Sequence, residues 1–540
     1  MAMATTILTN GSIWLGKAEG FAQAIALDGD KVLAAGSTAE IEALASEATT
    51  RIDLEGKFAM PGIYDAHTHL AMYGRGLRDI DAAPTAVKSL EELYAKIAEK
   101  AKGVPEGGWI IARGYDHTKL AEGRHPHRTE LDAAAPGRKV YVVRTCGHVS
   151  VANSLVLQEA GIGHNTPNPD GGEIYRDETG LTGLLAENAR FPVHAIMPKD
   201  DLDAWVAGIE AGGKDMLRYG ITSTMDAGVG MEAGWLEVEA YLEAKKQGRL
   251  PVRVAATFMG DKDVSILDEA IEKGFVTGVG CNMWKVGPVK FFTDGSAGSY
   301  TAAVTEPYVG TDNRGIFCLT DEECDALAKR AHDAGYQMAI HAIGDAAIEQ
   351  ILNAMEKAQT ANPSAKPMRH RIEHCGWLAD GQIERMVRLG VYPAPQPTFM
   401  YYFGENYAGA LGQKRTDFAY PMRAFVDAGL EPSASTDCPV TALNPFAGIY
   451  GMVTRKTWKG TVIGADQRLT VAEALHAYTY SGAFGTHDEE IKGRLIPGQL
   501  ADIAVLSANP FEIDPEEILQ LRCVKTLLGG KVVYEEAVAA

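Results

Sequence analysis

The sequence has few cysteines and no long apolar run, and each shortage excludes a class of protein. Its 7 cysteines are scattered over 540 residues, and none forms a C-x-x-C pair. An odd, scattered set does not suit a disulfide framework, so we expect a reducing compartment, namely the cytoplasm. No stretch approaches the roughly 18 uninterrupted apolar residues of a membrane-spanning helix. The first residues also lack a basic segment followed by an apolar core, so we predict neither a membrane span nor a signal peptide.

Positive charge is scarce as well. The chain has 51 Lys and Arg residues against 71 Asp and Glu residues, which gives a formal net charge of −20. Nucleic acids and anionic membranes bind basic patches, so neither is expected as a partner. The G-x-S-x-G nucleophile elbow and a dinucleotide-binding glycine fingerprint are also absent, which argues against nucleophile-elbow and Rossmann chemistry. The remaining expectation is a protein that acts on a small molecule.

What the chain does contain is a regular alternation of strand and helix patterns from residue 200 onward. After a first strand near residue 63, strands are predicted at 221–226, 252–258, 286–293, 337–341, 371–374, 391–394 and 432–437. Repeated βα units predict a parallel sheet. About eight units can be assigned, which favours an α/β fold of the (β/α)8 barrel type over a doubly wound sheet.

The two ends of the chain have a different pattern, with short β segments separated by Gly and Asp turns. We therefore predict a small β domain built from both termini, residues 1–58 and 485–540, and a barrel from 59 to 484. A stretch at about 75–200 interrupts the barrel after its first strand with further α and β patterns, so we predict an α/β insertion there.

A His-x-His pair, His67 and His69, follows the apolar run at 58–63, which predicts a buried strand. In a strand, residues two apart point to the same face, so both imidazoles are expected to converge. Two convergent neutral imidazoles are half of a metal site. Isolated histidines are usually exposed or satisfied by ordinary hydrogen bonds, so the pair is informative only if later strands supply matching ligands.

Later strands do supply such residues. His341, His374 and Asp437 each end a predicted barrel strand, and Lys290 lies within the strand at 286–293. The C-terminal strand ends of a (β/α)8 barrel form one face, and chemistry takes place there. Histidines and an aspartate at these positions therefore predict a metal site.

Lys290 is unusual in such a site because an ammonium group repels a metal cation. One interpretation is a lysine paired with Asp294, or a solvated residue at the edge of the sheet. The other is that CO2 has carboxylated the amine, which would then present a carboxylate able to bridge two metals. The residues alone leave both open.

These motifs resemble the metal-dependent amidohydrolase superfamily, most closely the subfamily that includes N-substituted formamide deformylases, amidohydrolase family 3. The matching segments cover nearly the whole chain: Pro61-Gly62, Asp65-Ala66-His67-Thr68-His69, His148 to Ser154, Lys290 to Ser296, His341 to Ala346, Glu373-His374, Ser435 to Pro439 and Gly498 to Asp502. The resemblance implies a distorted TIM barrel, a β-sandwich built from both chain ends, and usually zinc.

The resemblance also implies the roles of individual residues. It assigns His67, His69, His341, His374 and Asp437 to the metal site and puts Lys290 in the place of the bridging carboxylated lysine. Either one or two metals remain possible. Imidazole and carboxylate ligands suit Zn²⁺, although Mn²⁺, Fe²⁺ or Co²⁺ would also fit.

Such a site predicts hydrolysis of an amide-type C–N bond by a metal-activated water. Asp437 is the expected catalytic residue, because a carboxylate there can take a proton from water and pass it to the leaving amine. His374 or another site histidine can stabilise the oxyanion. Lactone or cyclic imide hydrolysis, deamination, isomerisation and a non-catalytic scaffold are the alternatives. A homodimer is expected.

A few polar residues outside the predicted metal site have a less certain function in the sequence, and some of them allow two interpretations. Gln396 follows the strand at 391–394 and can face the site. His148, with Asn153-Ser154 after it, either contacts substrate or belongs to a structural cap. His117, His125 and His127 lie in the polar segment 116–128 and are expected to be exposed loop residues. No residue is assigned to substrate binding.

Overall fold

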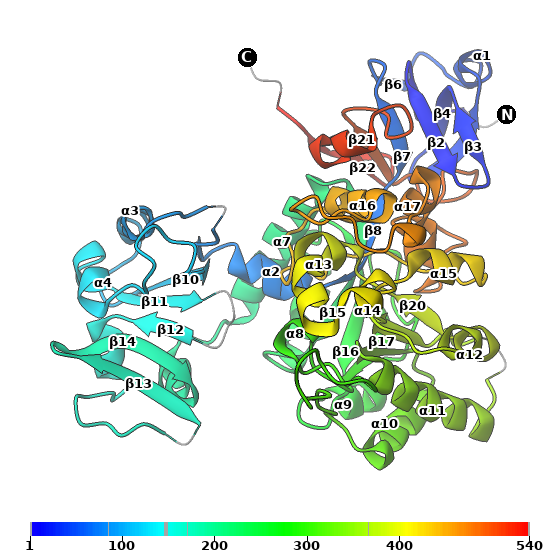
Figure 1. Cartoon of the computed structure of the whole chain (residues 1–540). Helices are drawn as coiled ribbons and strands as arrows, with labels where there is room; N and C mark the ends of the chain where they lie inside the picture. Colours follow the sequence, from blue (N-terminus) through cyan, green and yellow to red (C-terminus); the bar gives the residue numbers. More distant parts are fainter. Residues whose placement is uncertain (1–2, 85, 145–148, 170, 365–366, 538–540) are drawn as a thin grey trace. The chain divides into compact units, whose positions relative to one another are not determined.

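The computed structural model describes residues 3–84, 86–144, 149–169, 171–364 and 367–537 (Figure 1). The chain forms two compact units, one of Met1–Tyr73 with Ile209–Ala540 and the other of Gly74–Gly208. Within the described ranges no helix is long and apolar enough to cross a membrane.

A seven-stranded parallel sheet, in the order β20-β19-β18-β17-β16-β15-β8, forms the centre of the first unit. Its strands are β8 (Ile63–Thr68), β15 (Ile221–Val229), β16 (Arg253–Met259), β17 (Trp284–Phe292), β18 (Met338–Ala342), β19 (Arg371–His374) and β20 (Tyr392–Ala394). Neighbouring strands follow one another along the chain and are parallel, so each pair is joined by a crossover. The predicted α/β barrel is therefore confirmed.

Helices supply these crossovers. They include α7 (Leu202–Leu217), α8 (Trp235–Lys246), α9 (Leu267–Glu272), α10 (Asp321–Asp333), α11 (Asp345–Ala361) and α12 (Gln382–Leu389). Two further helices, α13 (Pro397–Leu411) and α15 (Met422–Asp427), follow β20. The start of α10 shows why the sequence folds this way locally. Thr320 and Glu323 form a capping box, and acidic residues in the first turn complement the helix dipole.

The predicted eighth strand at 432–437 is wrong as a regular strand, although its segment lies where the barrel closes. Ser433 N–H donates to a β20 carbonyl (3.4 Å), while the Ala434 carbonyl accepts from a β8 amide (3.3 Å). Asp437 N–H donates to a β8 carbonyl (2.9 Å). Pro432 has no N–H to donate, and Asp437 has a left-handed φ of 54°, so a continuous ladder cannot form.

The predicted apolar strand at 58–63 divides between two sheets. Its first part is β7 (Phe58–Pro61), which pairs with terminal strands, whereas the barrel strand β8 begins at Ile63. Gly62 lies between them, where a Cβ atom would come within 2.1 Å of Thr222 Oγ1 on β15. Only glycine allows the backbone to pass so close to the neighbouring strand.

Two sheets contain strands from the chain termini, in the orders β5-β4-β1-β6 and β23-β22-β21-β7-β2-β3. Their strands are β1 (Thr6–Thr9), β2 (Ser12–Gly16), β3 (Gly20–Ala22), β4 (Ala24–Asp28), β5 (Lys31–Gly36), β6 (Thr50–Asp53), β21 (Ile503–Leu506), β22 (Cys523–Leu528) and β23 (Lys531–Glu535). Leu8 and Ile25 from the start of the chain share one buried apolar cluster with Ile503 and Leu527 from its end. Burial of this cluster joins the two ends of the chain.

The second unit has its own six-stranded sheet and its own apolar clusters. The strands are β9 (Ile80–Asp81), β10 (Trp109–Tyr115), β11 (Lys139–Arg144), β12 (Val149–Ala152), β13 (Gly172–Asp177) and β14 (Gly180–Glu187). Asn153 caps helix α5 (Ser154–Glu159) by accepting from Val156 N–H, as the capping interpretation predicts. His148 lies outside the described residues.

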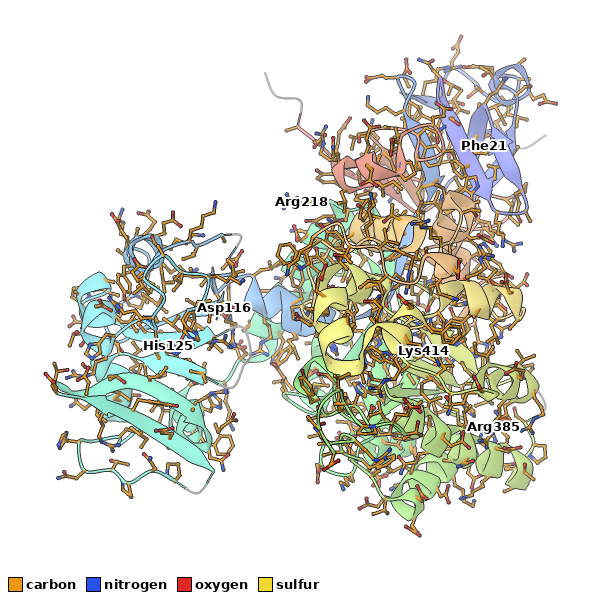
Figure 2. All side chains as sticks on the ribbon, in the orientation of Figure 1. Phe21, Asp116, His125, Arg218, Arg385 and Lys414 are labelled. Atoms are coloured by element: carbon orange, nitrogen blue, oxygen red, sulfur yellow. The ribbon has the colours of Figure 1, made fainter. Side chains whose placement is uncertain are left out.

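The histidines after β10 are more enclosed than the sequence predicted. His125 and Asp116 lie in this segment (Figure 2), and the His125 ring stacks on His117 with centroids 4.0 Å apart. His125 Nδ1 also lies 2.9 Å from the Tyr115 hydroxyl, and His127 caps helix α4 (Arg128–Ala134). All three histidines are half-buried, so the prediction of exposed loop residues was wrong.

A buried histidine pair beside the barrel predicts how stability depends on pH. Met338 N–H donates to His370 Nδ1 (3.1 Å), so the His370 proton is on Nε2 and is donated to His332 Nδ1 (2.9 Å). His332 Nε2–H then donates to the Asn362 carbonyl (2.7 Å). Burial, with His332 as a further cause, lowers the pKa of His370 to about 3. The His370 ring is therefore neutral in the folded state.

We expect the free energy of unfolding to fall as the pH drops below about 6.5, because the unfolded chain then binds a proton that folded His370 does not. The contribution is fully present above that pH and is lost toward about pH 3, at about 1.4 kcal/mol per pH unit. Urea denaturation across this range should show a shallower pH dependence for His370→Gln than for the unchanged chain. If the free energy of unfolding of both proteins depends equally on pH, this pH effect does not come from His370.

Candidate metal centre

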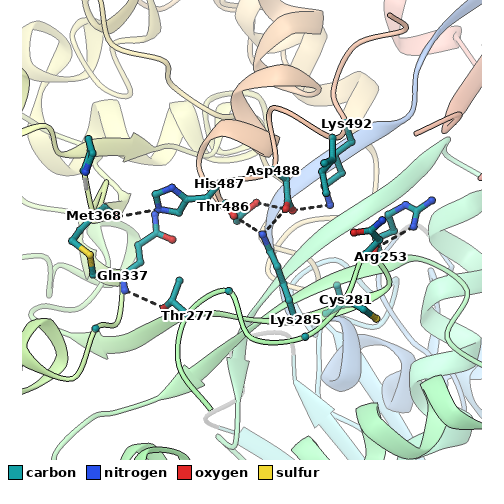
Figure 3. A pocket seen from close by; sticks show the side chains of 17 residues that line it. Arg253, Thr277, Cys281, Lys285, Gln337, Met368, Thr486, His487, Asp488 and Lys492 are labelled. Carbon is teal, nitrogen blue, oxygen red and sulfur yellow. Dashed lines mark hydrogen bonds and ion pairs between the residues drawn. The ribbon is translucent and has the colours of Figure 1, made fainter. Parts of the chain in front are cut away.

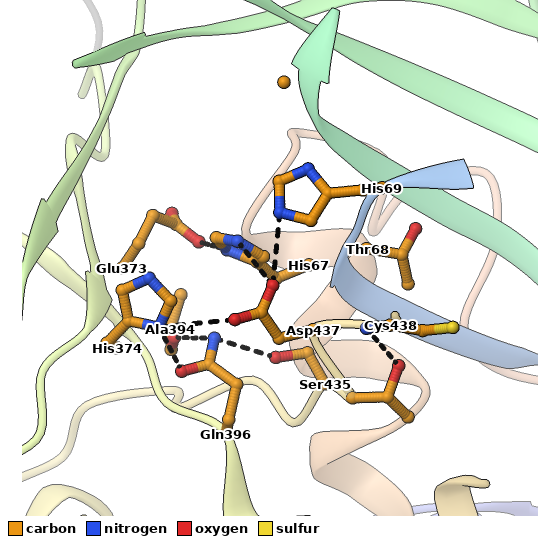
Figure 4. Close-up of polar contacts among 12 residues, drawn as sticks. His67, Thr68, His69, Glu373, His374, Ala394, Gln396, Ser435, Asp437 and Cys438 are labelled. Atoms are coloured by element: carbon orange, nitrogen blue, oxygen red, sulfur yellow. Dashed lines mark hydrogen bonds and ion pairs between the residues drawn. The ribbon is translucent and has the colours of Figure 1, made fainter. Parts of the chain in front are cut away.

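The predicted metal-site residues lie at or near the C-terminal ends of the barrel strands. They are His67 in β8, His69 directly after β8, Lys290 in β17, His341 in β18, His374 at the end of β19 and Asp437 in the irregular closing segment. Figure 4 shows four of them, His67, His69, His374 and Asp437. His69 is outside the strand, so strand alternation does not place it. Its N–H donates to the Cys438 carbonyl (2.8 Å), which fixes the residue instead.

His67 and His69 both face Asp437. Asp437 Oδ1 lies 3.5 Å from His67 Nε2 and 3.2 Å from His69 Nε2. In the described part of the chain, these three side chains form a group whose ligand atoms all lie within 4.8 Å of one another. Two imidazoles and a carboxylate in this arrangement can hold a divalent transition metal.

His374 and His341 adjoin this group without joining it. The rings of His67 and His374 have centroids 5.0 Å apart, and those of His374 and His341 are 4.4 Å apart. His374 Nδ1 lies 4.0 Å from Asp437 Oδ2. His341 Nε2 donates to the Gly295 carbonyl (3.0 Å), so this nitrogen is already used in a hydrogen bond.

Lys290 is buried, with only 1% of its surface exposed, so it is not a solvated edge residue. Its predicted partner, Asp294, instead accepts N–H groups from Ile343 (3.0 Å) and Gly344 (2.8 Å). Lys290 Nζ lies 4.9 Å from the Phe292 ring centroid, and none of the ion pairs among the described residues includes it. Burial lowers the pKa of the Lys290 amine, although Glu373 and Asp437 act in the opposite direction.

Glu373 holds His67 in one tautomer. Glu373 Oε2 lies 2.5 Å from His67 Nδ1, and Glu373 Oε1 accepts from Arg371 Nε (2.6 Å). All three side chains are fully buried. A carboxylate only accepts, so His67 donates Nδ1–H and keeps its Nε2 lone pair toward Asp437. The sequence analysis assigned no role to Glu373. The feature that could have indicated one is a pair of charged residues, Arg371 and Glu373, two positions apart in a buried strand.

Two buried polar atoms in this group lack a hydrogen bond. His67 Nε2 and Asp437 Oδ1 have no hydrogen-bond partner among the described residues. Such atoms are rare in folded proteins and are often explained by an ion. Burial also lowers the pKa of His67 well below its ordinary range, so the ring is neutral and can act as a ligand. The donor set therefore fits a divalent metal.

The backbone around Asp437 fixes the position of its carboxylate. The preceding residue, Thr436, donates its N–H (3.0 Å) and hydroxyl (2.7 Å) to Asp65. Asp437 and His374 have left-handed φ values of 54° and 69°, and such strain is common at functional sites. Burial alone would raise the pKa of Asp437, but His67 and His69 keep it below its ordinary value. The carboxylate is therefore ionised at neutral pH.

Comparison with known proteins gives consistent matches along the chain. Residues 50–534 match the sequence profile of the amidohydrolase family. The chain is 30% identical to YtcJ of Bacillus subtilis over 514 residues, covering 92% of each protein. It is 28% identical to an N-substituted formamide deformylase of Arthrobacter pascens over 525 residues, covering 95% of each. A crystal structure of a metal-dependent hydrolase from Pyrococcus furiosus matches with a TM-score of 0.77 and 29% identity, covering 94% of this chain and 100% of that one.

Proposed function

This chain belongs to the amidohydrolase family, as its motifs predicted, and we propose that it hydrolyses an amide-type C–N bond of a small molecule. The observation that carries the proposal is the convergence of His67, His69 and Asp437, with two of their buried ligand atoms left without a hydrogen bond. An amidohydrolase needs such a group to bind a metal ion.

His67, His69 and Asp437 would hold a divalent metal, for which zinc is the expected choice. The other predicted ligands, His341, His374 and Lys290, lie beside this group and would extend it toward a second ion. When bound, the metal supplies an activated water and polarises the substrate carbonyl.

Asp437 would transfer the proton. Its low pKa keeps it ionised at neutral pH, so it can accept a proton from the attacking water. The same carboxyl group then delivers that proton to the departing amine nitrogen. This second transfer matters because an amine is a poor leaving group until it is protonated.

His374 is better suited to be a ligand than an oxyanion donor. The Gln396 carboxamide donates its Nε2–H to the Ala394 carbonyl (3.2 Å), which leaves Oε1 facing His374 Nδ1 at 2.7 Å. His374 therefore carries its proton on Nδ1, and burial lowers its pKa well below the ordinary value. A neutral ring in this tautomer presents a lone pair on Nε2, which binds a metal and cannot donate to an oxyanion.

A substrate screen tests the proposed reaction. Metal-loaded protein would be assayed with N-substituted formamides, other amides, lactones and cyclic imides. We expect release of an amine from at least one amide, because a relative of this chain is an N-substituted formamide deformylase. Turnover of lactones or cyclic imides without any amide would contradict the proposed bond class, and no turnover of any compound would favour a non-catalytic scaffold.

Lys290 is proposed to carry a CO2-derived carboxylate that bridges two metals. Lys290→Ala should then reduce the metal content from two ions per chain toward one and lower amide hydrolysis. Metal analysis by mass spectrometry measures the first effect, and Lys357→Ala on the exposed surface is a control. Full metal content and activity in Lys290→Ala would refute the bridge. One ion per unmodified chain would support a mononuclear site.

Homodimer formation and a cytoplasmic location stay predictions. Light scattering during size-exclusion chromatography measures the assembly directly.

A further inference from the structure

A second pocket, of about 410 Å³, lies at the N-terminal ends of the barrel strands (Figure 3). Arg253 begins β16, Lys285 is near the start of β17, and Gln337 directly precedes β18. The segment 486–492 completes the lining. The predicted metal-site residues lie at the other ends of these parallel strands, so the pocket is separate from the metal centre. Its volume is within the range of small-molecule sites.

The pocket wall has more positive than negative charge. Lys285 Nζ lies 2.6 Å from Asp488 Oδ1, and Lys492 Nζ lies 3.0 Å from Asp488 Oδ2, so two ammonium groups share one carboxylate. Lys492 and Asp488 are only 7% and 6% exposed. Arg253 does not change the balance, because Asp502 pairs with it through two contacts of 2.6 and 2.9 Å. Lys285 Nζ also donates to the Thr486 carbonyl (2.5 Å), but one positive charge of this lysine pair is left without a counter-ion.

A hydrogen-bond acceptor is also unused in the same pocket. Gln337 donates both hydrogens of its Nε2 group, to the Arg369 carbonyl (2.6 Å) and the Gly485 carbonyl (3.0 Å). These bonds fix the carboxamide, and Oε1 is buried without a partner among the described residues. Gln337 is 1% exposed. A buried, unpaired acceptor is costly unless something donates to it.

We propose that this pocket binds a small organic acid that carries a hydroxyl or amide hydrogen-bond donor. The acid's carboxylate neutralises the excess charge of Lys285 and Lys492, and its donor group satisfies Gln337 Oε1. Val254, Met368 and Ile491 also line the pocket and contact the apolar part of the ligand. This combination of a charged end, one polar group and an apolar wall is typical of small-molecule sites.

The first test is calorimetric titration of the full-length, metal-loaded protein with 3-hydroxybutyrate. Butane-1,3-diol lacks the carboxylate and butyrate lacks the hydroxyl, so we expect no binding of the diol and weaker binding of butyrate. Lys285→Met should weaken binding of the hydroxy acid by about tenfold or more, because it removes a charge-assisted contact. The variant keeps Lys492 as a partner for Asp488, so we expect it to fold. Lys357→Met, an exposed lysine, should bind like the unchanged chain.

Cys281 provides a second readout that does not involve the metal. This exposed thiol lines the pocket, so bound 3-hydroxybutyrate should slow its alkylation by iodoacetamide, as followed by peptide mass spectrometry. The proposal is overturned if no acid binds saturably or if Lys285→Met binds as tightly as the unchanged chain. It is also overturned if binding requires the metal and leaves Cys281 alkylation unchanged, because the acid would then be at the metal centre.

Discussion

Asp437→Asn is expected to lower kcat/KM for an amide substrate by about 10³-fold, within the range for loss of a group that transfers protons in the transition state. Asparagine has nearly the same shape, but its amide cannot accept a proton from water or return one to the amine. The loss should appear in kcat, because proton transfer belongs to the chemical step. Steady-state kinetics with metal-replete protein measure it.

The matched control is Asp380→Asn, which makes the same change at an exposed position on the barrel unit. It should leave kcat/KM unchanged. Metal content must be measured for both variants, since Asp437 is also a proposed ligand. If Asp437→Asn retains full activity, Asp437 is not the proton-transfer residue.

Glu373→Gln is expected to reduce metal affinity by about 10- to 100-fold, the usual effect of removing a group that orients a ligand histidine. Glu373 fixes the His67 tautomer through a 2.5 Å contact to Nδ1. The same substitution leaves the Arg371 guanidinium buried without its carboxylate. We therefore expect a loss of about 3–5 kcal/mol in the free energy of unfolding. Metal titration and urea denaturation measure the two effects separately.

A double variant separates stability from metal binding. Adding Arg371→Met to Glu373→Gln removes the unpaired buried charge, so part of the lost stability should return. Metal affinity should remain low, because His67 still lacks its carboxylate partner. Glu384→Gln, on the exposed face of α12, is the surface control. Unchanged metal affinity in Glu373→Gln would refute the orienting role.

Predictions from the sequence were most accurate where a strand or helix pattern occurs together with residue types that can bind a metal. The alternation of strand and helix patterns predicted the barrel, and residues such as His67 and His341 could be located because each follows an apolar strand pattern. The apolar run at 58–63 shows the limit of this approach. The run predicts a single strand, but β7 and β8 belong to different sheets. A continuous apolar run does not show where the chain passes from one sheet to the other.

Contacts distant in the sequence could not be predicted. Glu373 meets His67 across 306 residues, and no local pattern in either segment identifies the partner. The eighth strand failed for a different reason: its closing position depends on tertiary packing, while Pro432 and the left-handed Asp437 prevent a regular ladder. The pocket at the N-terminal strand ends likewise combines segments from residue 253 to residue 492.

The most direct test of the proposed metal-dependent hydrolysis is to measure amide hydrolysis and metal content in the same sample before and after chelation. We expect the metal-free protein to be inactive and measured zinc addition to restore activity in proportion to the metal bound. His67→Ala should bind less metal and regain little activity under the same conditions. Full activity in protein shown to contain no metal would contradict the central claim.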